Sequence, residues 1–247
     1  MSPRQDRPVA LITGASRRVG ASIARTLHAA GYDLALHYHH SEAEMRALCA
    51  ELEALRAGST LALQADLVQV PALRSLVEDA HVHYGRLDAL VNNAAAFSAA
   101  QLDTTTPELW DEHMAVNVRA PFFLTQACHA HLRTSHGAIV NLADIYADHP
   151  RADLLAYAAS KAALVSLTRG LASALAPDVR VNAVAPGAIL WPDAASSGEL
   201  RASLMARTPL QRTGTPDELA NAVLWLLRDA TYCTGVVLHV DGGRGIS

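Results

Sequence analysis

The sequence predicts a single α/β domain built on a doubly wound parallel sheet. Short apolar runs alternate with longer helical stretches from one end of the 247-residue chain to the other. Most of the short runs are almost continuously apolar, as expected for strands that helices cover on both faces. A glycine turn directly follows the first run, which is typical of the first strand–helix connection in an open α/β sheet.

Seven segments are expected to form the strands: residues 9–13, 33–37, 60–64, 89–92, 138–141, 179–185 and 236–240. Repeated alternation of strand and helix indicates parallel βαβ units with right-handed crossovers. A closed barrel of alternating strands and helices is the alternative, but it needs eight strands and has no glycine-rich turn after the first. We therefore expect one domain over residues 1–247, with the aperiodic residues 187–214 forming a flap on the substrate side.

Three helix starts can be recognised from capping patterns. Thr106 and Thr215 each precede a proline, which places an N-cap hydroxyl before a proline at the first helical position. Ser41 and Glu44 have the spacing of a capping box. Each pattern predicts that a helix begins at the next residue.

Composition limits the classes of function. The chain is 51% hydrophobic with a formal net charge of −4, which argues against disorder and against a basic surface for nucleic acid. Its polar start has no apolar signal core, and no apolar run reaches about 18 residues, so we expect a cytoplasmic protein without a membrane span. Cys49, Cys128 and Cys233 lack metal-site spacing and are expected to be buried or half-buried free thiols.

The turn after the first strand has the features of a phosphate-binding loop. Gly14 permits a tight turn, and Gly20 permits close packing of the following helix on the strand. Arg18 and Val19 lie between them, where the N–H groups of a helix N-terminus attract a pyrophosphate. Within a βαβ unit this pattern predicts a dinucleotide site, and the sheet is then expected to be of the Rossmann type.

The end of the second strand indicates which dinucleotide binds. Enzymes that use NAD place a carboxylate there for the ribose hydroxyls, whereas this strand is followed by His39, His40 and Ser41. Imidazoles, a hydroxyl and the guanidinium of Arg17 or Arg18 favour a 2′-phosphate, so we predict NADPH. The alternative, in which Ser41 only caps a helix, is compatible with phosphate binding. No grouping of the histidines with cysteines or carboxylates predicts a metal site.

Residues after the third and fourth strands complete the predicted cofactor site. Asp66, followed by Leu67, is placed either to accept a hydrogen bond from the adenine amine or to cap the next helix. Asn93 and Ala94 follow the fourth strand, at the sheet edge where ligands bind in such folds.

Tyr157 and Lys161 lie four residues apart in an alanine-rich helical stretch and therefore share one helical face. A phenol is a poor acid near neutral pH, because its reference pKa is about 10. A nearby ammonium favours the phenolate and lowers that pKa, which makes proton exchange with a substrate feasible. The pair predicts acid–base chemistry.

Together these motifs resemble the short-chain dehydrogenase/reductase family over essentially the whole chain. The matching residues are Thr13-Gly14 with Gly20, Asn92-Asn93-Ala94, Asn117, Tyr157 with Lys161, Pro186-Gly187 and Asp241-Gly242-Gly243. The resemblance implies that Asn117 holds a water in a proton relay through the lysine and the tyrosine. It also implies that Pro186 and Gly187 contact the cofactor and that the protein is a homotetramer.

Three positions resemble the pteridine reductase subgroup of that family. Arg18 replaces the middle glycine of the turn, and Asp144 replaces a serine thirteen residues before the catalytic tyrosine. Phe97 stands where the subgroup stacks an aromatic ring on the pterin. Ala95 departs from the subgroup, which commonly has a serine there near the nicotinamide. Each of the three also has a structural alternative, as an exposed helix cation, a turn residue and a core residue respectively.

These side chains suit a pterin, because the nitrogen of its C=N bond must be protonated as a hydride reaches the carbon. Asp144 beside Tyr157 raises the coupled pKa values and keeps a proton in the site. Arg18 is expected to bridge the cofactor phosphate and the pterin, and Phe97 to sandwich the ring against the nicotinamide. We therefore predict NADPH-dependent reduction of a biopterin- or dihydropterin-type substrate, or of dihydrofolate.

Two alternatives to pterin reduction remain open. One is an NADPH-dependent carbonyl or 3-oxoacyl-thioester reductase, in which Asp144 is merely tolerated. The other is a catalytically idle protein that senses NADPH. The intact set of Asn117, Tyr157 and Lys161 argues against the second, because a sensor needs no proton relay.

Overall fold

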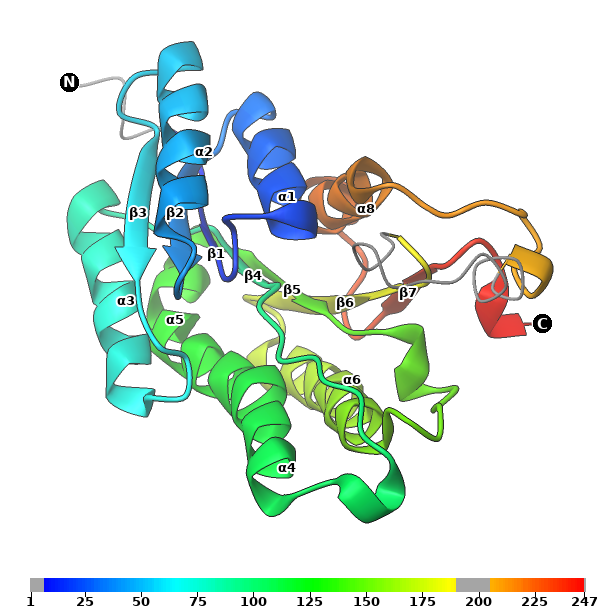
Figure 1. Cartoon of the computed structure of the whole chain (residues 1–247). Coiled ribbons are helices and arrows are strands. Elements are labelled where there is room, and N and C mark those ends of the chain that lie inside the picture. Colours follow the sequence, from blue (N-terminus) through cyan, green and yellow to red (C-terminus); the bar gives the residue numbers. More distant parts are fainter. Residues whose placement is uncertain (1–6, 190–204, 247) are drawn as a thin grey trace.

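The computed structural model describes residues 7–189 and 205–246, and it confirms the predicted parallel sheet of seven strands (Figure 1). The strands are β1 (Val9–Ile12), β2 (Asp33–Tyr38), β3 (Thr60–Gln64), β4 (Ala89–Asn92), β5 (Ala138–Leu142), β6 (Arg180–Pro186) and β7 (Val237–Val240). Each begins and ends within one residue of its expected bounds, because continuous apolar runs bounded by turns mark buried strands clearly.

The order of the strands places a crevice at the middle of the sheet. The strands lie in the order β3-β2-β1-β4-β5-β6-β7, so the chain reverses its direction of winding after β3. β1 therefore pairs with β2 on one side and with β4 on the other, with Ile12 level with Leu36 and Val91. In doubly wound sheets, ligands bind beyond the carboxyl ends of the strands at this switch point.

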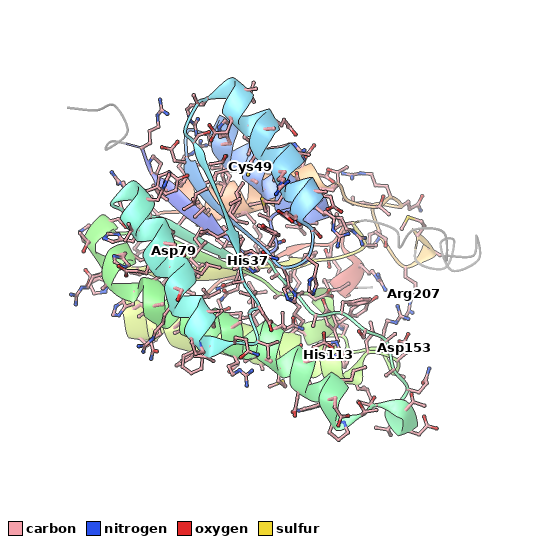
Figure 2. All side chains as sticks on the ribbon, turned by 60° about the vertical axis from the view of Figure 1, so that its left-hand side comes forward. His37, Cys49, Asp79, His113, Asp153 and Arg207 are labelled. Carbon is pink, nitrogen blue, oxygen red and sulfur yellow. The ribbon has the colours of Figure 1, made fainter. Side chains whose placement is uncertain are left out.

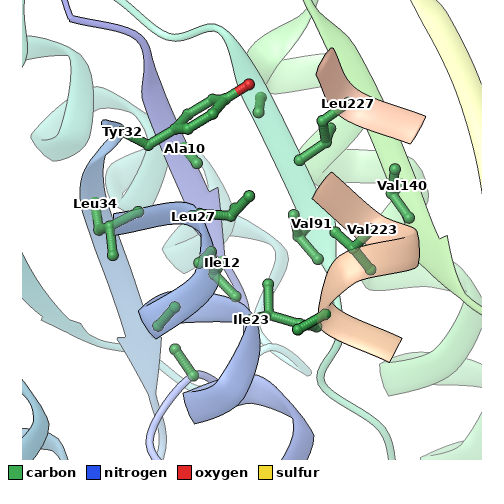
Figure 3. Packing of buried hydrophobic residues seen from close by; sticks show 14 of the residues in the cluster. Ala10, Ile12, Ile23, Leu27, Tyr32, Leu34, Val91, Val140, Val223 and Leu227 are labelled. Carbon is green, nitrogen blue, oxygen red and sulfur yellow. The ribbon is translucent and has the colours of Figure 1, made fainter. Parts of the chain in front are cut away.

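Helices cover both faces of the sheet (Figure 1). They are α1 (Arg18–Ala29), α2 (Glu42–Leu55), α3 (Val70–Tyr84), α4 (Pro107–Met114), α5 (Ala120–Ser135), α6 (Leu155–Leu175) and α8 (Pro216–Arg228). One buried cluster joins α1, α2 and α8 to the strands, and a second joins α3, α5 and α6. In the first, Ile23 and Leu27 of α1 lie with Val223 and Leu227 of α8 over the central strands (Figure 3). Burying each such side chain contributes about 1.5–3 kcal/mol, so both clusters stabilise the packing of the helices on the sheet.

Two of the three predicted caps are confirmed. The Thr106 hydroxyl caps α4, and Thr215 forms a reciprocal capping box at the start of α8. Ser41 precedes α2, but its side chain makes no cap hydrogen bond, so the capping-box prediction is wrong. Its backbone (φ −89°, ψ 59°) lacks the extended conformation that points a cap hydroxyl at the helix N–H groups. Glu44 instead lies 3.6 Å from the Arg17 guanidinium.

Most of the predicted flap, residues 190–204 with Trp191, lies outside the described residues. Just after this gap, Gly214 donates a backbone hydrogen bond to Ala188. Within the described ranges, no helix is long and apolar enough to cross a membrane. The same ranges contain no group of histidine, cysteine and acidic side chains that could hold a metal ion. The three cysteines are free thiols, buried or half-buried as predicted.

Candidate active site

The glycine turn between β1 and α1 forms a close-packed cradle at the switch point. Gly14 has a φ of 62°, in the left-handed region. A Cβ on Gly14 would lie 3.0 Å from the Cα of Ala94, and a Cβ on Gly20 would collide with the Gly14 carbonyl oxygen. Neither position accepts a side chain, so the turn packs closely against the loop after β4, as in glycine turns that bring a pyrophosphate to a helix N-terminus.

The loop after β4 is tied to this cradle by side chains. The Asn93 amide donates to the carbonyl oxygens of Thr13 (2.8 Å) and Gly14 (2.9 Å). In return, the Thr13 hydroxyl accepts from the backbone N–H groups of Asn93 and Ala94, each at 3.0 Å. Asn93 and Ala94, predicted as cofactor-binding residues, therefore join the two sides of the crevice.

His37, labelled in Figure 2, hydrogen-bonds to the glycine turn, a role that the sequence analysis missed. Its Nδ1 accepts from the Gly14 N–H at 3.1 Å, and its Nε2 donates to the Ala65 carbonyl at 3.1 Å. One ring nitrogen accepts and the other donates, so the ring is neutral. Burial lowers the pKa of His37 to about 4, which keeps it neutral. In the sequence, the only signal was a histidine inside an apolar strand.

The residues predicted to select NADPH lie together at the end of β2. His39 and His40 are exposed, with ring centres 3.5 Å apart, and Ser41 follows them. Arg17, at the N-cap of α1, reaches the same edge through its ion pair with Glu44. The strand end carries no carboxylate for ribose hydroxyls. This set of donors fits a 2′-phosphate.

Other predicted cofactor residues lie at the ends of β3 and β6. Asp66 accepts the Val68 N–H at 2.9 Å and so shapes the turn before α3, next to buried Leu67. Pro186 ends β6, and a Cβ on Gly187 would meet the chain that follows β7. Contacts of these residues with a cofactor stay predictions.

The three side chains predicted from separate acid–base motifs come together beyond β5. The Tyr157 hydroxyl donates to Asp144 Oδ2 at 2.9 Å. Asp144 caps the short helix η3 (Ile145–Ala147), where its other oxygen accepts a backbone N–H. The Lys161 ammonium donates to the Leu142 carbonyl at 2.7 Å and lies 5.7 Å from the centre of the Tyr157 ring.

Burial dominates the protonation of this group. Burial, followed by the Asp144 carboxylate, raises the pKa of Tyr157 well above its ordinary value. Burial also raises the pKa of Asp144, although its hydrogen bonds and Lys161 oppose this. Burial lowers the pKa of Lys161 to about 8. The expected lowering of the Tyr157 pKa by Lys161 is therefore wrong as a net effect. The expected rise caused by the carboxylate is found for Tyr157, whereas the hydrogen bond from Tyr157 lowers the pKa of Asp144 and does not raise it. The site retains protons.

Phe97 and Arg18 lie at the open side of the site. The Phe97 side chain is 60% exposed, and its ring packs edge-on against Tyr157 with centroids 4.8 Å apart. A flat substrate therefore has access to an aromatic surface next to the phenol. Arg18 is exposed and has a left-handed φ of 51°, the conformation that favours the glycine it replaces.

Asn117 lies in a π-helical turn, η2 (Ala115–Arg119), between α4 and α5. Its buried amide bonds both the N–H and the carbonyl of Ala96, at 2.9 and 3.0 Å, and donates to Ser160 at 2.9 Å. The side chain thus links the loop after β4 to α6. The predicted water relay stays a prediction: both amide protons are engaged by these bonds, so a water at this side chain would have to donate to the amide oxygen.

Tyr146 and two arginines form a further part of the site that sequence reasoning missed. The Tyr146 hydroxyl accepts from Arg151 at 3.4 Å and from Arg244 at 3.2 Å. Both guanidiniums also lie over its ring, 5.7 and 5.5 Å from the centre. The charge of Arg244 favours the ionised form of Asp144 and so lowers its pKa. No sequence spacing indicates this contact between the loop after β5 and the chain end.

Residues 14–244 match the model of a family described as enoyl-(acyl carrier protein) reductase. The chain belongs to the short-chain dehydrogenase/reductase family. This short-chain reductase is 40% identical over 245 residues to granaticin polyketide synthase putative ketoacyl reductase 2 from Streptomyces violaceoruber, covering 96% of each chain. It is 32% identical over 292 residues to pteridine reductase 1 from Leishmania tarentolae, covering 100% of this chain and 99% of the other.

A solved structure extends the similarity to the fold. The crystal structure of a blue fluorescent protein from a metagenomic library, in complex with NADPH, superposes with a TM-score of 0.89. The two chains are 38% identical, and the match covers 96% of this chain and 97% of that one. Family membership places this protein among the oxidoreductases. It does not separate pteridine reduction from ketoacyl reduction, because relatives of both kinds match along the whole chain.

Proposed function

We propose that this protein is an NADPH-dependent pterin reductase that acts on a biopterin- or dihydropterin-type substrate or on dihydrofolate. The observation that carries the proposal is the 2.9 Å hydrogen bond from Tyr157 to Asp144. Burial raises the pKa of both groups, so each holds its proton more tightly than the free side chain does, next to the atom that is to be protonated. Reduction of a ring C=N bond needs such a proton supply at nitrogen.

The cofactor is NADPH, which supplies a hydride when bound. The turn at Gly14 and Gly20 is packed so closely that a Cβ at either position would meet the protein's own atoms, and a glycine turn of this kind at a helix N-terminus suits a pyrophosphate. His39, His40 and Ser41 offer donors to a 2′-phosphate at a strand end without a carboxylate. The NADPH complex of a relative that is 38% identical supports this choice.

Each residue of the site has a defined task in this proposal. Tyr157 passes its hydroxyl proton to the ring nitrogen, and Asp144 returns a proton to the phenolate through their hydrogen bond. Lys161 holds a positive charge 5.7 Å from the phenol ring and limits the cost of the phenolate. Phe97 and Arg18, both exposed on the open side, orient the flat substrate.

A 3-oxoacyl-thioester reductase is the second candidate. The 40% identity with a putative ketoacyl reductase favours it over the 32% identity with a pteridine reductase. In that case Tyr157 protonates a carbonyl oxygen, and Asp144 acts only by holding the phenol in place. Ala95, where pteridine reductases commonly have a serine, also fits this candidate.

Substrate preference under one set of conditions tests both candidates. Purified protein is mixed with NADPH and, in turn, biopterin, dihydrobiopterin, dihydrofolate and an acetoacetyl thioester, while NADPH absorbance is followed. We expect the highest kcat/KM with a pterin. Reduction of the thioester without reduction of any pterin would contradict the proposal. Tight NADPH binding without any turnover would instead indicate a sensor.

Two variants assign the proton donors. Tyr157→Phe removes the hydroxyl and is expected to lower kcat at least about 100-fold, the range of general acid catalysis, while NADPH still binds. Asp144→Ser is expected to reduce pterin turnover far more than thioester turnover. Asp144→Asn is the matched control for shape, since it keeps the size of the side chain but not its proton. Equal losses with both substrates would remove the pterin-specific role of Asp144.

A further inference from the structure

His113 is a buried histidine that the proposed chemistry does not use. It lies near the end of α4 and is 0% exposed (Figure 2). Its ring stands edge-on to the Tyr157 ring, with centroids 6.0 Å apart and planes at 70°. A buried polar side chain against the proton donor calls for a physical reason, because burial without partners is costly.

Both ring nitrogens of His113 are hydrogen-bonded to backbone. Nδ1 donates to the Leu109 carbonyl one turn earlier at 2.9 Å, and Nε2 accepts the Ser98 N–H at 3.2 Å. A carbonyl can only accept and an N–H can only donate, so these partners select a single neutral tautomer. The bond to the helix thus orients the ring, and the oriented ring holds the loop at Ser98.

Asn117 holds the same loop two residues earlier. Its amide accepts the Ala96 N–H at 2.9 Å and donates to the Ala96 carbonyl at 3.0 Å. His113 and Asn117 are four residues apart in one continuous helical stretch, which places both side chains on one side of it. The backbone of residues 96–98 is therefore fixed at both ends, with Phe97 between the two anchors.

Among residues 7–189 and 205–246, little else holds Phe97. Its side chain is 60% exposed, and its ring contact is the edge-on packing against Tyr157 at 4.8 Å. An exposed ring gains little from burial, so the backbone decides where it points. We infer that His113 is a positioning residue, which with Asn117 clamps residues 96–98 and thereby fixes the Phe97 ring that orients the substrate. This inference rests on the proposed contact between Phe97 and substrate.

A double-mutant cycle tests whether His113 acts through Phe97. The variants are His113→Leu, which removes the acceptor at similar volume, Phe97→Ala and the double variant. We expect His113→Leu to lower substrate kcat/KM about 10-fold, mainly through KM, with an unchanged NADPH Kd. In the Phe97→Ala background the same change is expected to cost less than 2-fold. An equal loss in both backgrounds would overturn the inference.

His113→Gln and hydrogen exchange separate positioning from a general effect on folding. Gln keeps an acceptor for Ser98 and is expected to retain kcat/KM within 3-fold. If His113→Leu does not fold, His113→Met takes its place in the cycle. Amide exchange of the peptide that contains residues 96–98 is expected to accelerate at least 10-fold without the acceptor, while that of β4 is unchanged. Unchanged exchange at Ser98 would also overturn the inference.

Failure of the proposed function and failure of the role of His113 give different results. If the wild type reduces no pterin, the proposed function fails. The cycle is then measured with the acetoacetyl thioester, because a clamp on Phe97 affects any substrate that touches its ring. The exchange experiment needs no turnover and reports on the bond between His113 and Ser98 in either case.

Discussion

At the scale of single residues, His37 shows how a buried base makes stability depend on pH. Its pKa falls from 6.5 to about 4 on folding, so between these values the unfolded chain binds a proton that the folded protein does not. Stability contributed by the neutral ring is present above pH 6.5 and is lost as the pH falls towards 4. At about 1.4 kcal/mol per pKa unit, this lowers the free energy of unfolding by about 3 kcal/mol.

We therefore predict that His37→Gln unfolds with a weaker acid dependence. At pH 7 the variant is expected to be less stable than the wild type, because the bonds to Gly14 and Ala65 are altered. Between pH 7 and pH 4 this difference is expected to shrink by about 3 kcal/mol. Urea unfolding at several pH values measures it. A constant difference would show that His37 is not the titrating group.

Lys161, unlike His37, is buried in its charged form at neutral pH and therefore destabilises the folded protein. Its pKa falls from 10.5 to about 8 because the ammonium is buried. The free energy of unfolding is highest above pH 10.5, where the amine is neutral in both states, and it decreases as the pH falls through 8. At pH 7 the buried ammonium therefore lowers the stability of the folded protein by about 3 kcal/mol. The protein keeps this destabilising charge beside Tyr157, where the proposed chemistry uses it.

Replacement of that lysine is expected to stabilise an inactive protein. We predict that Lys161→Met raises Tm at pH 7 and abolishes turnover, as active-site residues commonly trade stability for activity. The gain is expected to diminish between pH 8 and pH 10.5, where the wild-type amine loses its proton. Thermal unfolding at pH 7 and pH 10 distinguishes the two states. A lower Tm at pH 7 would mean that the bond to Leu142 outweighs burial.

At the scale of elements, the C-terminal turn η4 (Arg244–Ile246) takes part in the acid–base site. Asp241 holds this turn by accepting the N–H groups of Gly243 and Gly245 at 2.8 and 2.7 Å. The turn brings Arg244 to Tyr146 and near Asp144, whose pKa it lowers. An element more than 80 residues away in the sequence thereby acts on the pKa of Asp144.

Removal of the Arg244 charge is expected to shift the pH dependence of kcat. With Arg244→Gln the pKa of Asp144 rises, because one charge that favours the carboxylate is lost. If the protonated form supports turnover, as proposed, the alkaline limb of kcat shifts to higher pH. Arg228→Gln, an exposed arginine on α8, is the control and is expected to leave the profile unchanged. Identical profiles for all three proteins would contradict the role of η4.

The helix caps show where a local sequence pattern is enough to predict structure. Thr106 and Thr215 cap their helices as predicted, because a hydroxyl before a proline at the first helical position needs only neighbouring residues. Ser41 and Glu44 have an equally good local pattern, but Ser41 makes no cap hydrogen bond and Glu44 lies 3.6 Å from Arg17 at the N-cap of α1. The turn there adopts a backbone that capping does not favour. The backbone conformation of the turn therefore decides whether a local capping pattern is realised.

At the scale of the whole molecule, α4 and α5 present an apolar surface that suits self-association. Trp110 and Phe122 are 44% and 39% exposed there. Phe122 lines a groove of about 770 Å³, together with apolar residues such as Met114 and Leu167 and with four charged residues at 108, 111, 112 and 119. The family resemblance predicts a homotetramer, and this surface is the one we expect to be covered in it.

Light scattering on variants tests this assembly. The wild type is expected to have about four times the mass of one chain, and Phe122→Glu is expected to reduce it by placing charge in an apolar interface. Leu55→Glu is the matched control, because Leu55 is an exposed apolar residue on α2, away from the groove. A monomeric wild type, or dissociation by the control alone, would contradict the assignment of this surface.

The sequence by itself determined the strand bounds, the class of sheet, the glycine cradle and the pairing of Tyr157 with Lys161. These features depend on periodicity, on the conformations open to glycine and on helical spacing, which are all local. Only the tertiary structure decided the direction of the Tyr157 pKa shift, because burial and Asp144 outweigh Lys161. Likewise, only folding brings Arg244 to the site and His113 to the Phe97 loop. Long-range packing sets desolvation and contact, and no residue spacing encodes either.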